Sequence, residues 1–267
     1  MSRKRQSNKR QELNNANLAL VQNGKAMEEG RKIKNWTTHD LKSIRPLTPA
    51  QEDVFHGWYN NDHICLHGSA GTGKTFLGLY LALNEVLQKN QSRIIIVRSA
   101  VATREVGFLP GTLEEKVAQY EIPYQDILSD LIGKHSSYND MKDAGVIEFM
   151  TTSFIRGLTW DNAVIVVDEG ENMTFHEINS IMTRMGKNSR IIFTGDILQT
   201  DLDGKKHGVS GMSDALNVFD CMRDFACVEF TKKDIVRSDF VRDWIVATEE
   251  VLSLSLIHIS EPTRPKR

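Results

Sequence analysis

The chain alternates between short, almost wholly apolar runs and longer segments with helical periodicity. Segments 76–88 and 174–184 repeat their apolar residues at the spacing of a helix. Six apolar runs are strand candidates, at residues 64–66, 94–97, 146–150, 164–167, 191–194 and 227–230. Short apolar strands separated by helices are typical of a mostly parallel sheet with helices on both faces. The pattern therefore predicts an α/β fold.

A glycine-rich segment lies between the first of these strands and the first helix. It fits the phosphate-binding pattern G-x-x-x-x-G-K-[ST] and reads Gly68-Ser69-Ala70-Gly71-Thr72-Gly73-Lys74-Thr75. Glycines allow consecutive backbone N–H groups to surround an anion. Lys74 would place its charge on the outer phosphates, and Thr75 would offer a hydroxyl to Mg²⁺. The segment predicts a site for a nucleoside triphosphate and Mg²⁺.

The strand candidate at 164–167 is followed by two acids, Asp168 and Glu169. The carboxyl ends of parallel strands form the edge at which such folds bind ligands. Asp168 is therefore expected to hold Mg²⁺. Glu169 is expected to orient and deprotonate the attacking water, which makes it a candidate catalytic residue.

The next strand candidate, 191–194, leads into Gly195-Asp196 and then Gln199. A glutamine amide can bond both a γ-phosphate oxygen and an attacking water, so Gln199 is a candidate catalytic sensor. The alternative is a polar turn in which glycine and aspartate serve only the backbone.

Several segments together resemble the PhoH-like ATPases, which are single ATPase domains related to superfamily-one helicase cores. The matching segments are 107–111, 156–159, 168–172, 183–186, Gly195-Asp196 with Gln199, and 234–237. The resemblance spans about residues 47–250. It implies a RecA-like P-loop fold, ATP hydrolysis and a role on RNA or DNA. It also implies that Gln51 contacts adenine, whereas chemistry alone equally allows a helix N-terminal residue after Pro49.

The chain departs from the usual pattern of this family at two places. Gly170 and Glu171 stand where the family usually has Ala-Gln, and Ser99 follows Arg98 where it usually has proline. Neither departure removes an ATP ligand. Both lie in segments that link the state of ATP to the nucleic-acid strand in helicase relatives, and the variant set resembles a phage-type member.

A transition state at the γ-phosphate is stabilised by an arginine. Arg237 is the first candidate for this catalytic role, ahead of Arg184, Arg156 and Arg98. The alternative for Arg237 is an ordinary surface ion pair with a neighbouring aspartate. Two-lobed helicases bind ATP between two such domains, and this chain has length for one. We therefore expect a neighbouring subunit of a homo-oligomeric ring to complete the site.

The chain is expected to have three parts, the first of which is marked by its charge. The net charge is −2, yet residues 1–46 contain eleven Lys/Arg and only four Asp/Glu. Residues 1–45 are expected to form a basic, flexible arm that either contacts nucleic acid or is a solvated leader. Residues 46–251 are the expected ATPase domain. Residues 252–267 are the expected non-native tail, because 254–264 resemble a translated sequencing adapter.

Composition excludes some classes of protein. The longest apolar runs are too short to span a bilayer, and the three cysteines lack zinc-ligand spacing, so a cytoplasmic location is expected. ATP, Mg²⁺ and single-stranded RNA or DNA are the expected ligands, with no membrane partner. An ATP-dependent switch or scaffold without motor activity is the alternative function, and a small-molecule kinase is the third.

Overall fold

The computed structural model describes residues 36–60, 63–99, 113–196 and 209–260, with the side chains of 113–117 and 252–260 excepted. Its centre is one parallel sheet with the strand order β3-β2-β4-β5-β1-β6. The strands are β1 (His63–Gly68), β2 (Arg93–Arg98), β3 (Ile147–Thr151), β4 (Ala163–Asp168), β5 (Arg190–Gly195) and β6 (Phe225–Phe230). All six strand predictions are confirmed.

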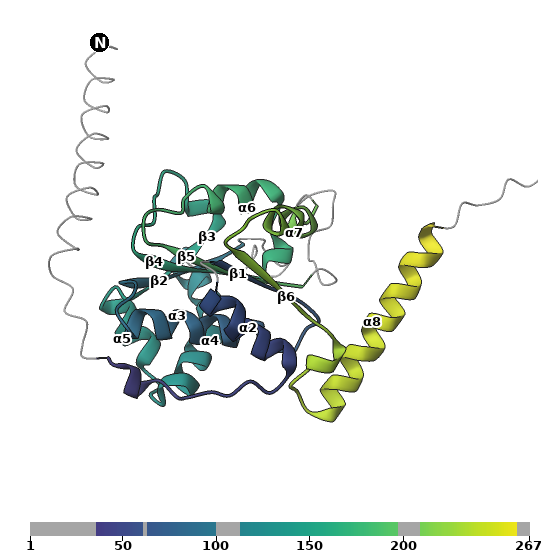
Figure 1. Ribbon diagram of the computed structural model, residues 1–267, viewed down its shortest axis with the longest axis horizontal. Coiled ribbons are helices and arrows are strands. Elements are labelled where there is room, and N and C mark those ends of the chain that lie inside the picture. The colour runs from purple at the N-terminus through teal and green to yellow at the C-terminus, as the bar shows by residue number, and fades with distance from the viewer. Residues whose placement is uncertain (1–35, 61–62, 100–112, 197–208, 261–267) are drawn as a thin grey trace, which may run out of the picture.

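Helices cover both faces of the sheet, as predicted (Figure 1). The face that packs against α3 also carries α2, α4 and α5, and α6 and α7 cover the other face. The bounds are α2 (Pro49–Asn60), α3 (Lys74–Leu87), α4 (Leu113–Ile132), α5 (Ser137–Asp143), α6 (Phe175–Met182) and α7 (Met212–Asp220). Short 3-10 turns are η1 (Thr38–Asp40), η3 (Thr152–Phe154), η4 (Gly170–Asn172) and η5 (Lys232–Asp234). The predicted helices at 76–88 and 174–184 correspond to α3 and α6.

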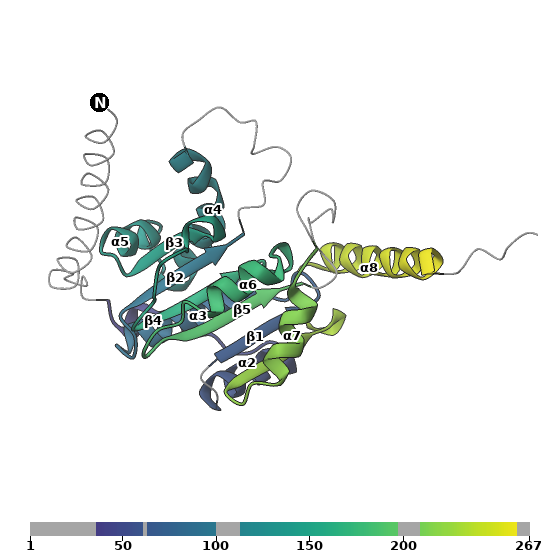
Figure 2. The ribbon, with the colours of Figure 1, turned by 90° about the horizontal axis from the view of Figure 1, so that it is seen from above.

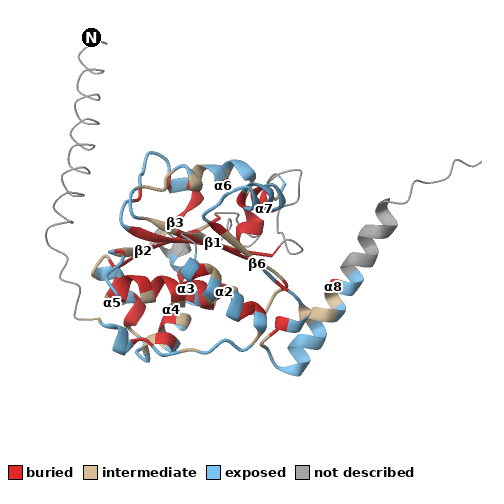
Figure 3. Ribbon diagram, viewed as in Figure 1, coloured by how far each residue is buried: buried red, intermediate tan, exposed pale blue. Residues whose placement is uncertain are grey.

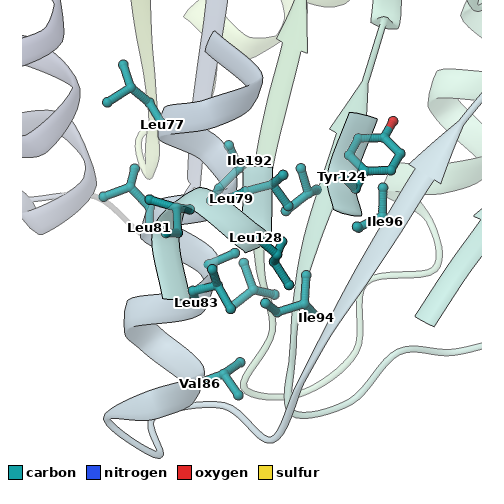
Figure 4. Close-up of a cluster of buried hydrophobic side chains, with 14 of the residues drawn as sticks. Leu77, Leu79, Leu81, Leu83, Val86, Ile94, Ile96, Tyr124, Leu128 and Ile192 are labelled. Atoms are coloured by element: carbon teal, nitrogen blue, oxygen red, sulfur yellow. The ribbon is translucent and has the colours of Figure 1, made fainter. Parts of the chain in front are cut away.

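The core consists of two apolar layers separated by the sheet (Figure 3). Successive residues of a strand point to opposite faces. In β4, Val164 and Val166 therefore belong to the layer under α3, whereas Ile165 and Val167 belong to the layer under α6. Figure 4 shows the first layer, where leucines of α3 meet β2, β5 and α4. Burial on both faces explains why these strands are almost wholly apolar.

The strand order decides which loops meet at the carboxyl edge of the sheet. β5 lies between β1 and β4, and β2 flanks β4 on its other side. The glycine-rich loop after β1 and the acids after β4 therefore lie at the same edge, with the end of β5 between them. This edge is where parallel α/β sheets bind their ligands.

The final helix, α8 (Asp239–Ser260), projects away from the sheet (Figures 1 and 2). Its backbone continues past residue 251 into the segment expected to be a tail. Most of the expected basic arm lies outside the described residues. Within the part of the chain that the structure describes, no helix is long and apolar enough to cross a membrane.

Candidate nucleotide site

The glycine-rich loop begins where β1 touches the edge strand β6. Gly68 has φ 112°, and a Cβ added there would lie 2.0 Å from the carbonyl oxygen of Phe230. The same oxygen accepts a hydrogen bond from the N–H of Ser69 over 2.9 Å. Only glycine fits this approach, because any side chain would meet backbone. Gly71 and Gly73 also have positive φ values, of 71° and 87°.

Lys74 lies across the loop at the start of α3. Its ammonium donates to the carbonyl oxygens of Gly68 and Ser69, each over 2.7 Å. Burial lowers the pKa of Lys74, an effect opposed by nearby carboxylates led by Asp196. A desolvated ammonium beside curled backbone N–H groups suits an anion such as a triphosphate. The loop residues therefore fit a nucleotide.

Asp168 is the centre of a hydrogen-bond network at the end of β4. Its Oδ1 accepts from the hydroxyls of Thr75 over 2.8 Å and Thr194 over 2.6 Å. Its Oδ2 accepts from the hydroxyl of Tyr124 over 2.9 Å. The structure thus places the two predicted metal ligands, Thr75 and Asp168, in direct contact. Carboxylate and hydroxyl oxygens are the hard donors that Mg²⁺ prefers, so the pair fits that ion.

Strand alternation explains why these side chains meet. Asp168 has the same parity as Val166, and Thr194 has the same parity as Ile192, so both polar side chains face the α3 side of the sheet. Thr75 lies in the first turn of α3, and Tyr124 lies on α4 over that face. Figure 4 shows the Tyr124 ring at the margin of the apolar cluster.

Glu169, the predicted general base, follows Asp168 in a left-handed backbone conformation with φ 53°. Both of its carboxylate oxygens accept from the guanidinium of Arg98. The Nε atom donates to Oε2 over 2.9 Å, and an Nη atom donates to Oε1. Burial raises the pKa of Glu169, and the charge of Arg98 acts in the opposite direction.

Gln51 lies on α2 and is buried beneath the loop. Its Oε1 accepts from the N–H of Leu47 over 2.9 Å, and its Nε2 donates to the carbonyl oxygen of Thr72 over 3.2 Å. The amide therefore supports the loop backbone from below. Gln51 also lines the neighbouring cleft, so its contact with adenine stays a prediction.

A cleft of about 680 Å³ opens beside the loop. Its walls come from the segment before α2, from the loop and the first turn of α3, and from Val236 and Arg237. The N–H of Val236 donates to the carbonyl oxygen of Gly71 over 3.1 Å, which fixes this segment against the loop. Arg237 is exposed at the cleft. The structure therefore brings this predicted arginine to the site.

Other predicted residues are not brought to the site. Arg184 follows α6 and donates through Nε to the carbonyl oxygen of Ile155 over 2.9 Å. Because α6 leads back to the start of β5, Arg184 lies towards the opposite edge of the sheet, which favours a structural role. Gln199 lies outside the described residues, so its sensor role stays a prediction.

Sequence reasoning missed two contacts of Asp168. Thr194 lies in a predicted strand, two residues after Ile192. The alternation of side chains along that strand would have placed it on the same face as Asp168. Tyr124 gave no such signal, because its approach depends on how α4 packs against α3 and α5. The contact of Arg98 with Glu169 likewise has no local signal, because it depends on the register of β2 against β4.

The parallel sheet, the glycine-rich loop and the acid-bearing strand joined to it by Thr75 define an α/β domain of the P-loop type. The family profile of PhoH-like proteins matches residues 43–249. The chain belongs to this family.

Named relatives agree with this assignment. The chain is 35% identical over 210 residues to a PhoH-like protein of Mycobacterium leprae, covering 78% of this chain and 59% of the relative. It is 35% identical over 211 residues to a PhoH-like protein of Bacillus subtilis, covering 78% of this chain and 65% of that relative. It is 35% identical over 204 residues to Protein PhoH of Escherichia coli, covering 75% of this chain and 57% of that relative. The chain thus spans less than two thirds of the length of these bacterial relatives.

Solved structures with a similar chain path are more distant. The large terminase of a thermophilic bacteriophage has 15% identity and a TM-score of 0.44, covering 73% of this chain and 48% of the terminase. Pif1 helicase of Candida albicans has 15% identity and a TM-score of 0.34, and the match covers 70% of this chain and 41% of the helicase. The expectation of a phage-type member stays a prediction.

Proposed function

We propose that the protein hydrolyses ATP with Mg²⁺ and couples hydrolysis to RNA or DNA. The hydrogen bond between Thr75 and Asp168, with Glu169 at the next position, carries this proposal. A metal-binding pair beside a carboxylate that can accept a proton suits transfer of a phosphoryl group to water.

The loop residues have complementary parts in this reaction. Backbone N–H groups of residues 68–75 bind the phosphates, and Lys74 exchanges its two carbonyl partners for phosphate oxygens. Mg²⁺, held by Thr75 and Asp168, would neutralise phosphate charge when bound. Glu169 orients the attacking water and accepts its proton.

Three further residues complete the proposed site. Gln51, beneath the loop, contacts adenine if its amide exchanges a backbone partner for the base. Arg237 supplies positive charge from the mouth of the cleft, and Gln199 senses the γ-phosphate. A neighbouring subunit in a ring closes the cleft, which is open in the single chain.

The charge distribution supports a polyanionic partner. The excess of lysine and arginine in residues 1–46 contrasts with the net charge of −2 for the whole chain. A basic segment attached to an acidic domain gains affinity for nucleic acid by releasing counterions. We therefore propose single-stranded RNA or DNA as the partner, in the cytoplasm.

ATP turnover of Glu169→Gln against the parent tests the hydrolytic role. The variant is expected to lose turnover and keep nucleotide binding, because glutamine keeps the shape and cannot accept the proton. Glu229→Gln on β6, an exposed position, is the matched control. Full turnover in Glu169→Gln contradicts hydrolysis through this residue.

Turnover measured with single-stranded RNA or DNA at two salt concentrations tests the coupling. Stimulation that declines with salt supports a phosphate-backbone partner. No stimulation by either polymer favours the alternative of an ATP-dependent switch or scaffold. Transfer of phosphate to a small acceptor instead of water would favour the kinase alternative.

A further inference from the structure

We propose that Arg98 is a positioning residue that holds Glu169 away from the glycine-rich loop, so that their ion pair must open before hydrolysis. This inference rests on the proposed role of Glu169 as the general base. It assigns to Arg98 a restraining role in the reaction, distinct from contact with the γ-phosphate.

The first support is the geometry of the pair. The Arg98 guanidinium donates from two nitrogen atoms, one to each carboxylate oxygen of Glu169. Such bidentate, charge-assisted pairs are stronger and more directional than single hydrogen bonds. The Arg98 side chain is only 17% exposed, against 38% for Glu169, so solvent screens the pair less than it would on an open surface. The pair therefore fixes the direction of the carboxylate.

The second support is the direction in which the pair draws Glu169. Arg98 is the last residue of β2 and lies opposite Asp168 in the parallel register. β2 flanks β4 on the side away from β5 and β1, which carries the glycine-rich loop. The carboxylate is thus bonded to a group on the far side of its own strand from the phosphate site.

The third support is the packing of α4 against Arg98 and Asp168. Tyr120 lies beside the Arg98 guanidinium, with 5.3 Å between the guanidinium carbon and the ring centroid. Tyr124, one helical turn later, donates to Asp168 over 2.9 Å. One face of α4 therefore supports Arg98 and the predicted metal ligand together. A guanidinium supported in this way loses less freedom when it forms the pair.

The reaction needs Glu169 to reach a water beside the outermost phosphate, near Lys74 and Thr75. A carboxylate with both oxygens bonded to Arg98 must leave at least one of these bonds to do so. The ion pair thus adds a step before proton transfer and slows basal turnover. Binding of ATP does not need this step, because none of the loop residues contacts Arg98 in the interactions described.

Steady-state ATP hydrolysis by Arg98→Gln and Arg98→Lys tests the proposal. Arg98→Gln is expected to raise basal kcat about three- to tenfold and to leave KM within about twofold. Arg98→Lys keeps the positive charge and loses the planar guanidinium. Its kcat is therefore expected to lie between that of the parent and that of Arg98→Gln. Arg93→Gln is the matched control, because Arg93 lies at the other end of β2 and pairs with Glu148 over 3.0 Å.

An unchanged or lower kcat in Arg98→Gln, with the variant folded and binding nucleotide like the parent, would overturn the restraint. The double variant Arg98→Gln/Glu169→Gln separates this inference from the proposed function. It is expected to be as inactive as Glu169→Gln alone. If Arg98→Gln accelerates turnover equally without Glu169, the effect does not act through this carboxylate. If Glu169→Gln alone stays fully active, the proposed general base itself is wrong.

Discussion

The hydroxyl of Tyr124 on α4 donates to Oδ2 of Asp168, while Thr75 and Thr194 donate to Oδ1 of the same carboxylate. The metal-binding candidate is therefore oriented from three elements. Tyr124 is completely buried, and burial raises its pKa well above the usual value. It thus remains a hydrogen-bond donor at neutral pH.

Tyr124→Phe removes one donor to Asp168 and keeps the ring in the core. We expect an increased Mg²⁺ requirement for turnover and a loss of about 1–3 kcal/mol in unfolding free energy, because a bond to a charged group is removed. Mg²⁺ titration of activity and chemical denaturation measure the two effects. Tyr138→Phe is the control, since its hydroxyl donates to Glu121 over 2.8 Å, outside this network. Equal Mg²⁺ requirements in the two variants would contradict the orienting role.

Gln51→Ala tests the amide beneath the loop. The N–H of Leu47 and the carbonyl oxygen of Thr72 lose their partner, so we expect a loss of about 1–2 kcal/mol in stability and weaker ATP binding. The adenine role adds a sharper expectation, in which affinity for ATP falls more than affinity for GTP. Isothermal titration with both nucleotides checks this against Glu52→Ala, an exposed neighbour. An equal fall in affinity for ATP and GTP would contradict the adenine contact and leave Gln51 only its role in supporting the loop.

The packing of Phe193 accounts for a glycine at position 170. A Cβ at this position would lie 2.1 Å from Cε1 of Phe193, a completely buried side chain. Gly170→Ala is therefore expected to cost about 1–3 kcal/mol through overpacking. Thermal or chemical denaturation measures the loss. Gly170→Ala/Phe193→Leu should recover part of it, and failure of the smaller side chain to do so would argue against this contact.

Glu171, one of the departures from the usual family pattern, has a pKa raised to about 8, chiefly by burial. Its Oε2 accepts from the N–H of Asp196 over 2.9 Å. A protonated carboxyl is neutral, as is the glutamine usual in the family. The folded protein thus retains a proton that the unfolded chain, with a carboxyl pKa near 4.5, releases. Stability from this group is complete below pH 4.5 and declines as the pH rises through about 8.

Glu171→Gln removes this titration. We expect the parent to lose roughly 3 kcal/mol more than the variant between pH 4.5 and pH 7, since one pKa unit corresponds to about 1.4 kcal/mol. Denaturant unfolding of the nucleotide-free protein across this range measures the difference. Glu229→Gln, at an exposed position, should follow the parent. Parallel pH curves for the parent and Glu171→Gln would contradict a raised pKa.

Local sequence patterns predicted much of the fold. Each apolar run predicted as a strand forms one, and in the central strands burial on both faces favours apolar residues at nearly every position. The glycine-rich segment also predicted its own conformation, since Gly68, Gly71 and Gly73 all have positive φ. Placing Thr75 beside Asp168 needed only the general rule that ligands bind at the carboxyl edge of such sheets.

The sequence alone determined the strands, the loop and the acids that follow β4, because each is encoded by neighbouring residues. Only the tertiary structure decided what surrounds those acids. Arg98 reaches Glu169 through the parallel register of β2 and β4, and Tyr124 reaches Asp168 through the packing of α4. Such contacts join residues far apart in the chain, and no local periodicity specifies them. The restraint on Glu169 is therefore a product of strand order and register.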